Sequence, residues 1–183
     1  MRILPHVLIN TDISDFAPLA RNIMLDGIVT HGHPRALVGA LAYGYALWKS
    51  IRRTEQLGFG EMVDDLLGNV PEWDSIPETS VAADDWIKAA SNHIPGYQNM
   101  WKSAVKEMID LLETCKKELS KGALTSDKET LRALQCFDQK TSGAGTVAAG
   151  AAVFLASRYA PDPINGLTTA AHAVGADTDT IAS

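Results

Sequence analysis

The sequence is poor in cysteine: Cys115 and Cys136 are its only two, and no second pair is present to complete a metal-binding knuckle. This scarcity argues against a disulfide framework and against a cysteine-based zinc site. No apolar run is long enough for a membrane-spanning helix. The opening stretch is too short for a secretory signal and is interrupted by Pro5 and His6. We therefore expect a cytoplasmic protein.

Runs of lysine or arginine are also absent, and the formal net charge is -6. The chain therefore has no basic stretch that could neutralise a row of phosphates, which argues against a nucleic-acid partner. An anionic small molecule remains compatible, because a divalent cation or a helix N-terminus can hold phosphate without net basic charge. Hydrophobic residues make up 46% and charged residues 21% of the chain. These values are typical of a soluble globular protein, and we expect one domain over residues 1–183.

Strand-like alternation of any length is absent, whereas helical periodicity recurs along the chain. Ser14 is a predicted helix cap, Pro34 a predicted first helical residue, and Ser126 with Glu129 a predicted capping box. The apolar spacing and these end signals predict helices at about 14–28, 34–51, 57–69, 81–92, 97–121, 130–139, 145–159 and 162–174. We therefore expect an all-α fold, an orthogonal array of seven or so helices rather than a regular bundle.

The last nine residues, GADTDTIAS, place Asp177, Asp179 and Thr180 shortly after Gly175. Two carboxylates two positions apart can converge on one point if the backbone there turns into a helix, and Gly175 permits such a turn. Oxygen ligands of this kind suit Mg²⁺, Mn²⁺ or Ca²⁺ better than Zn²⁺ or Cu²⁺. The residues alone leave open that Asp177 or Asp179 merely caps a helix.

Two further polar clusters stand at predicted helix starts. The first, Thr30-His31-Gly32-His33-Pro34, could contribute metal ligands, but the residues alone favour capping or packing roles. The second, 142–146, reads SGAGT and opens an alanine-rich helix. Its glycines would let a ligand approach backbone N–H groups at the positive end of that helix, and the alternative is a tight turn with close helix packing. The other histidines are predicted to be ordinary surface or hydrogen-bonded core residues: His6, His93 and His172.

In this order and at these spacings, the segments VTHGHPRAL, SGAGTVAAG and GADTDTIA resemble motifs of the ADP-ribosylglycohydrolase family, which includes the enzyme that reactivates dinitrogenase reductase. The opening MRILP also looks like the M-R-x-x-P part of a family segment in which glycine and asparagine precede the methionine. The resemblance covers nearly the whole chain apart from the stretch around residues 55 to 125. It implies an all-α domain with a two-metal magnesium or manganese centre at the base of an ADP-ribose cleft.

The resemblance also implies roles for particular residues. Asp177, Asp179 and Thr180 would be metal ligands, while no catalytic residue is assigned within this chain. Among the implied substrate-binding residues, His31 would lie at the cleft wall near the ribose. Three others would face the nucleotide: Gly143, Gly145 and Thr146. Many relatives carry tyrosine in place of Thr146, so an aromatic contact with the ligand is not expected there.

The family's other metal ligands, a Thr-Asp-Asp cluster and an N-terminal acidic residue, would lie upstream of Met1, and Asp84-Asp85 does not replace them. We therefore expect the C-terminal part of the domain, without its N-terminal helices, in a truncated or split chain. Its expected partners are an ADP-ribosylated substrate and a missing N-terminal half. The implied activity is metal-dependent hydrolysis of the glycosidic bond that links ADP-ribose to an acceptor. The alternatives are an inactive ADP-ribose- or nucleotide-binding module and a helical interaction domain.

Overall fold

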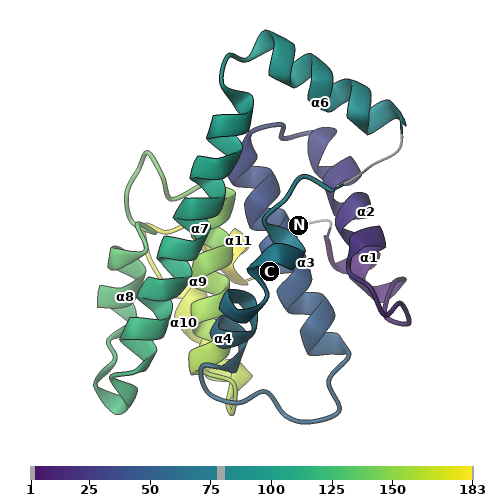
Figure 1. Cartoon of the computed structure of the whole chain (residues 1–183). Coiled ribbons are helices and arrows are strands. Elements are labelled where there is room, and N and C mark those ends of the chain that lie inside the picture. Colours follow the sequence, from purple (N-terminus) through teal and green to yellow (C-terminus); the bar gives the residue numbers. More distant parts are fainter. Residues whose placement is uncertain (1–2, 78–80, 183) are drawn as a thin grey trace.

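The computed structural model describes residues 3–77 and 81–182, without the side chains of residues 81–83 and 179. These residues form helices and no strand (Figure 1), which confirms the predicted all-α class. In chain order the helices are α1 (Ile3–Leu8), α2 (Ala17–Ile28), α3 (Pro34–Ile51), α4 (Glu61–Gly68), α5 (Val70–Trp73), α6 (Val81–His93), α7 (Tyr97–Leu119), the 3₁₀ helix η1 (Gly122–Leu124), α8 (Asp127–Ala133), α9 (Gly145–Arg158), α10 (Pro163–Ala171) and α11 (Thr178–Ala182).

The longer helices lie where the apolar spacing predicts them, and the differences arise at their ends. Helix α2 begins later than predicted, because Asp15 rather than Ser14 accepts a hydrogen bond from the Ala17 backbone, at 3.0 Å. The Ser126 cap is confirmed, since its hydroxyl accepts from the Glu129 backbone at 3.4 Å. Helix α8 nevertheless ends at Ala133 instead of reaching residue 139. The backbone of Gln135 has a φ of 65°, which a continuing helix cannot adopt.

Two short helices were not delimited by the apolar spacing: α1 was not expected, and α11 was anticipated only as a turn into a helix after Gly175. A helix of five or six residues carries too little periodicity to be recognised by its apolar spacing. Helix α1 buries Ile3 and Val7 and packs against α2 and α3. Helix α11 buries Ile181 and packs against α9 and α10. Tertiary contact therefore stabilises segments too short to be stable helices alone.

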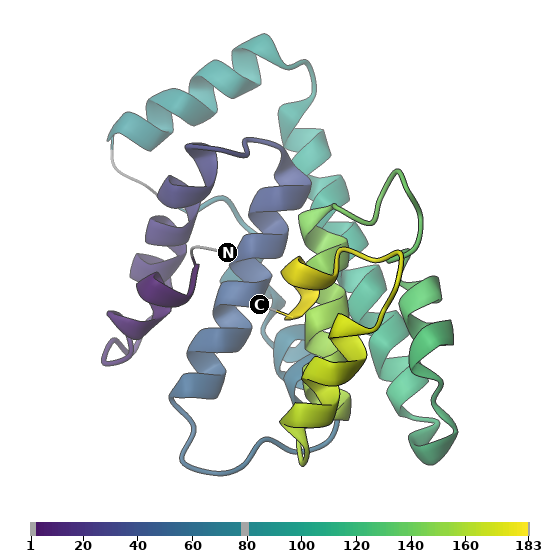
Figure 2. The same cartoon turned by 180° about the vertical axis from the view of Figure 1, so that it is seen from behind.

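Helices α3 and α9 form the centre of the molecule and make the most extensive contact of any two helices in the described part. Helices α2 and α7 flank this pair, while α10 and α11 pack on the other side of α9 (Figure 2). The close approach depends on glycine: a Cβ atom at Gly39 would lie 2.3 Å from the Gly145 carbonyl carbon. A Cβ atom at Gly145 would lie 2.9 Å from the Ala36 Cα atom. Close helix packing, one of the two roles that the sequence offered for Gly145, is therefore present.

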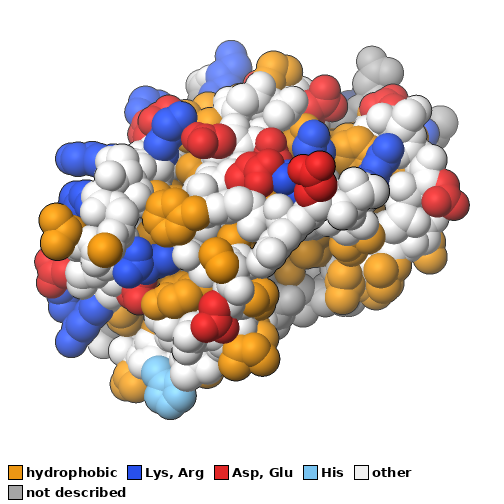
Figure 3. Space-filling view, turned by 90° about the horizontal axis from the view of Figure 1, so that it is seen from below, with side chains coloured by type: hydrophobic (Ala, Val, Ile, Leu, Met, Phe, Trp, Pro, Cys, Tyr) orange, Lys and Arg blue, Asp and Glu red, His pale blue; other side chains and the backbone are white. Residues whose placement is uncertain are grey.

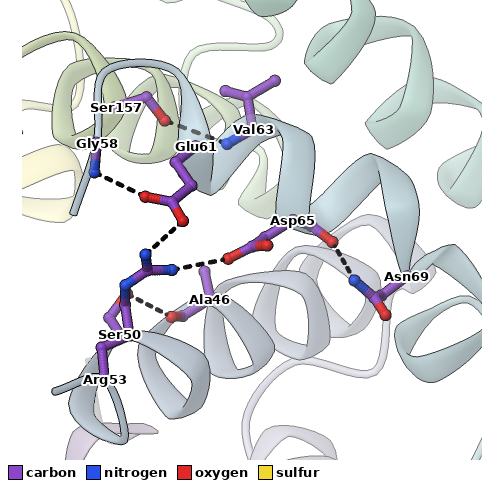
Figure 4. Close-up of polar contacts among 9 residues, drawn as sticks. All are labelled: Ala46, Ser50, Arg53, Gly58, Glu61, Val63, Asp65, Asn69 and Ser157. Carbon is purple, nitrogen blue, oxygen red and sulfur yellow. Dashed lines mark hydrogen bonds and ion pairs between the residues drawn. The ribbon is translucent and has the colours of Figure 1, made fainter. Parts of the chain in front are cut away.

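A polar cluster holds α4 against both central helices (Figure 4). Arg53, just beyond α3, pairs with Glu61 and with Asp65, the latter at 3.3 Å. The Glu61 carboxylate also accepts a hydrogen bond from the Gly58 backbone at 2.7 Å. On the other side of α4, the Val63 backbone donates to the buried Ser157 hydroxyl of α9 at 3.2 Å. The pairing of Arg53 with Glu61 thus joins the two ends of the loop between α3 and α4.

This cluster predicts a pH-dependent stability. The hydrogen bonds from Arg53 and from the Gly58 backbone hold the pKa of Glu61 below its ordinary value of 4.5. A carboxylate whose pKa is lowered in the folded state adds stability that is present above its unfolded pKa and is lost as the pH falls through the folded value. We therefore expect the wild-type chain to have a higher Tm than Glu61→Gln at neutral pH, and this difference to shrink on acidification below about 4.5. Thermal unfolding followed by circular dichroism tests this, and a difference that is independent of pH would contradict it.

Helix α6 lies at the periphery. It extends from the end of α7 across the end of α2 (Figures 1 and 2).

Among the described residues, no helix is both long enough and apolar enough to cross a membrane.

Candidate functional site

A pocket of about 550 Å³ lies where α2, α3, α9 and α11 meet, a volume within the usual range for small-molecule sites. Its wall includes predicted site residues from three distant segments: His31, Gly143, Gly145, Asp177 and Thr180. The remaining lining residues are mostly small or apolar: Ile3, Ile23, Asp26, Gly27, Thr30, Ala36, Leu37, Gly39, Ala40, Tyr43, Ala148 and Ala149. The fold thus gathers most of the sequence-predicted residues around one cavity.

His31 reaches the pocket from the loop between α2 and α3. Its Nδ1 atom lies 3.0 Å from the Thr30 hydroxyl oxygen. His33 has the capping role that the residues alone favoured, because its Nδ1 accepts a hydrogen bond from the Arg35 backbone at 3.2 Å. The two histidines of this motif therefore differ: His33 caps α3, and His31 lines the cavity.

Aromatic side chains from α6 and α7 hold this loop at Gly32. A Cβ atom on Gly32 would lie 2.5 Å from the Trp86 ring, so the ring packs directly on the glycine. The Tyr97 hydroxyl donates to the Gly32 carbonyl at 2.8 Å, and the rings of Trp86 and Tyr97 meet edge to face. Burial raises the pKa of Tyr97 to about 12. The phenol therefore keeps its proton, and remains a donor, at neutral and moderately alkaline pH.

Replacing Tyr97 with phenylalanine is expected to loosen the His31 loop. The substitution leaves the Gly32 carbonyl without its donor and should lower the free energy of unfolding by about 1 kcal/mol. It should also speed backbone amide hydrogen exchange at residues 31–33. The matched control is Tyr159→Phe, which removes a hydroxyl that donates to Asp127 at 2.6 Å, away from the pocket. Equal exchange rates at residues 31–33 in the two variants would contradict a local role for Tyr97.

The C-terminal motif turns into α11 as the sequence predicted. Gly175 has a φ of 96°, which confirms the expected turn. Asp177 directly precedes α11, and its carbonyl accepts a hydrogen bond from the Ile181 backbone at 3.0 Å. The side chains of Asp177 and Thr180 are both partly buried and line the pocket. The side chain of Asp179 lies outside the described part of the chain.

Thr146 is placed differently from the other predicted binding residues. Its side chain is fully buried and does not line the pocket. Its hydroxyl instead donates to the Glu107 carboxylate of α7 at 3.1 Å. The structure therefore brings Gly143 and Gly145 to the cavity but turns the Thr146 side chain away from it, because this residue belongs to the inner face of α9.

Sequence reasoning missed Asp26 and Tyr43, which also line the pocket. Asp26 follows the buried Ile23 by three residues, which places both on the same side of α2. A carboxylate three residues after a buried isoleucine, on the apolar face of α2, was the signal that could have identified it. Tyr43 carried no such signal, because an aromatic residue on an apolar helix face is ordinary core.

The carboxylate and hydroxyl groups of the pocket are oxygen donors, the kind of ligand that hard cations prefer. Mg²⁺ in proteins is held by one or two carboxylates, together with water and substrate phosphates. Asp26 and Asp177 supply carboxylates, and Thr180 supplies a hydroxyl. Among the described side chains, which do not include that of Asp179, no group of three or more His, Cys, Asp or Glu is arranged to hold a metal ion. The described oxygen donors fit magnesium or manganese better than zinc in type.

Other hollows lie outside this site. An apolar groove of about 540 Å³ runs between α3, α9 and α10 and shares Tyr43 with the site pocket. A pocket of about 700 Å³ between α8 and α10 includes the exposed His172. His172 and His93 are exposed, as predicted, and the Nδ1 atom of each lies within 2.9 Å of the backbone carbonyl four residues earlier. The face in Figure 3 mixes acidic, basic and hydrophobic side chains without a broad area of one charge.

Comparison with known proteins gives one result. A family model described as ADP-ribosylglycohydrolase matches residues 1–183. No curated protein and no solved structure matches the chain.

Proposed function

The chain belongs to the ADP-ribosylglycohydrolase family, and we propose that its pocket binds an ADP-ribosyl group and serves the metal-dependent hydrolysis of the bond between ADP-ribose and an acceptor. One observation supports this most directly. His31, the glycine loop before α9, and the Asp177–Thr180 turn are far apart in the sequence but line one cavity. A convergence of this kind is what a small-molecule site requires and what isolated helix caps would not produce.

The glycine loop supplies the proposed contact for the diphosphate. Gly143 and Gly145 present backbone without side chains to the pocket, directly at the start of α9. The first N–H groups of a helix have no partner within the helix and favour negative charge. An anionic diphosphate could therefore be held there although the chain has a net charge of -6.

The acidic and hydroxyl side chains of the pocket wall would hold the metal. Asp177 and Thr180, with Asp26 as a further carboxylate and Asp179 as implied by the family motif, would supply oxygen ligands. A bound divalent cation would stabilise negative charge on ribose oxygens and on an attacking water. His31 lines the cavity and is available to hydrogen-bond a ribose hydroxyl. In the net reaction, water adds across the bond between the ribose C1″ atom and the acceptor atom, and the acceptor leaves with a proton.

The experiment is release of free ADP-ribose from ADP-ribosylated arginine, serine and nucleic acid in the presence of Mn²⁺. It should be run with the chain alone and with the chain combined with a segment carrying the family's Thr-Asp-Asp cluster, because we propose that such a segment completes the metal centre. We expect release in the combined sample. No release in either sample, with all substrates tried, would contradict the proposed hydrolysis.

A second candidate is an ADP-ribose-binding module without turnover. It requires the cavity and the glycine loop but no metal centre, and His31, Gly143 and Gly145 line the cavity. Calorimetric titration with ADP-ribose, with and without Mn²⁺, separates the two functions. Binding that is independent of the metal, without release from any substrate, would support the binding module.

A further inference from the structure

Glu107 of α7 joins the starts of two helices that contribute to the pocket wall. Its Oε2 atom accepts hydrogen bonds from the Arg35 Nε at 2.7 Å and from the Thr146 hydroxyl at 3.1 Å. Its Oε1 atom accepts from the Arg35 Nη2 at 2.5 Å. Arg35 is the second residue of α3, and Thr146 is the second residue of α9. One carboxylate therefore connects three helices.

The connected residues are the immediate neighbours of pocket residues. Arg35 precedes Ala36 and Thr146 follows Gly145, and both Ala36 and Gly145 line the cavity. A Cβ atom at Gly145 would lie 2.9 Å from the Arg35 carbonyl oxygen, so the two backbones are in direct contact at this point. Glu107 itself is not a lining residue. It acts from behind the wall rather than on a ligand.

The environment of this connection makes it stronger than an exposed ion pair. The side chains of Arg35 and Glu107 are 27% and 25% exposed, and Thr146 is fully buried. Partial burial reduces screening by solvent and salt, and the two-pronged arginine–carboxylate geometry restricts orientation as well as distance. Rotation or displacement of the start of α9 would break the Thr146 bond and move Gly145.

We propose that Glu107 is a positioning residue that fixes the glycine loop, residues 142–146, in the geometry that binds the ADP-ribosyl group. This inference rests on the proposed function for its ligand. A purely stabilising role would lower the Tm without changing the affinity of the folded protein. A positioning role changes the affinity of protein that is still folded.

The test compares Glu107→Gln, Thr146→Val and Thr146→Ser with the wild-type chain by calorimetric titration with ADP-ribose. Thermal unfolding establishes that each variant is folded at the temperature of the titration. We expect Glu107→Gln and Thr146→Val to raise the Kd for ADP-ribose roughly tenfold, because the loop loses its anchor. Thr146→Ser retains the hydroxyl and should bind within about twofold of wild type.

The matched control is Asp127→Asn. Asp127 pairs with Arg158 at 2.5 Å, with side-chain exposures of 23% and 17%, and lies away from the site pocket. We expect this variant to lose stability without a change in the Kd. An unchanged Kd in Glu107→Gln, or an equal rise in Asp127→Asn, would overturn the positioning role.

Hydrogen exchange at the backbone amides of residues 142–146 provides a readout that needs no ligand. We expect faster exchange there in Glu107→Gln than in the wild type and in Asp127→Asn. A wild-type chain that binds no ADP-ribose would overturn the proposed function. Unchanged exchange would overturn the positioning of the loop, whatever the chain binds, so the two failures are distinguishable.

Discussion

Replacing Asp177 with asparagine is expected to abolish most of the Mn²⁺-dependent release of ADP-ribose. Loss of a group that only orients a metal ligand typically costs 10- to 100-fold, and removal of the negative charge of a ligand should exceed about 100-fold. Asp177 directly precedes α11 and lines the pocket beside Thr180. Calorimetry should also show Mn²⁺ affinity falling by at least about tenfold.

This substitution separates the two interpretations that the sequence left open for Asp177. Asparagine caps a helix about as well as aspartate, so Asp177→Asn would preserve a purely capping role. The matched control is Asp162→Asn, because the Asp162 side chain accepts a hydrogen bond from the Asn165 backbone at the start of α10 and does not line the pocket. We expect full Mn²⁺ affinity in the control. Wild-type Mn²⁺ affinity in Asp177→Asn would show that this carboxylate is a cap and not a ligand.

The second large effect is on stability, at the contact between α3 and α9. A Cβ atom at Gly39 would lie 2.3 Å from the Gly145 carbonyl carbon and 2.7 Å from the Thr146 nitrogen. Both are backbone atoms, which cannot move aside as a flexible side chain would. Gly39→Ala should therefore force the two central helices apart and lower the free energy of unfolding by about 3 kcal/mol, the upper part of the usual range for overpacking.

Chemical denaturation measures this loss, and Gly68→Ala is its matched control. Gly68 ends α4, and a Cβ atom there would meet nothing within 4 Å. Alanine at Gly68 should leave stability unchanged or raise it by up to about 1 kcal/mol, because alanine favours the helical state. A Gly39→Ala variant as stable as wild type would mean that the helices can separate without cost. Weakened ADP-ribose binding by folded Gly39→Ala protein would further link this contact to the pocket.

The extents of the longer helices could be read from the sequence with useful accuracy. Pro34 marks the first residue of α3, and the apolar stripe around Trp101 and Met108 belongs to α7. Such signals succeed because they are local: helix starts depend on capping and proline geometry, and helix faces depend on spacing within a few turns. The ends of the helices were predicted less accurately. The end of α8, for example, is followed by the positive φ of Gln135, which the apolar spacing does not indicate.

The family could also be identified from short segments, since the motifs carry residue types that chemistry requires at fixed spacing. The match of the family model to residues 1–183 confirms this identification. Spacing alone could not show that Thr146 points inward toward Glu107 while its neighbour Gly145 lines the cavity. Spacing could mark Asp26 as an inward-facing carboxylate, but it could not show that this residue joins the same wall. Both depend on the rotation of a helix about its axis relative to its neighbours.

Taken by itself, the sequence determined the helical class, the main helices and the three motifs, because these follow from interactions between residues close together in the chain. Only the tertiary structure decided that His31, Gly143 and Asp177 line one cavity. The physical reason is the backbone contact of Gly39 with Gly145, where two helices approach too closely for any side chain. That approach sets the positions of the loops at the starts of α3 and α9, and packing of α11 against α9 adds Asp177 and Thr180 to the pocket wall.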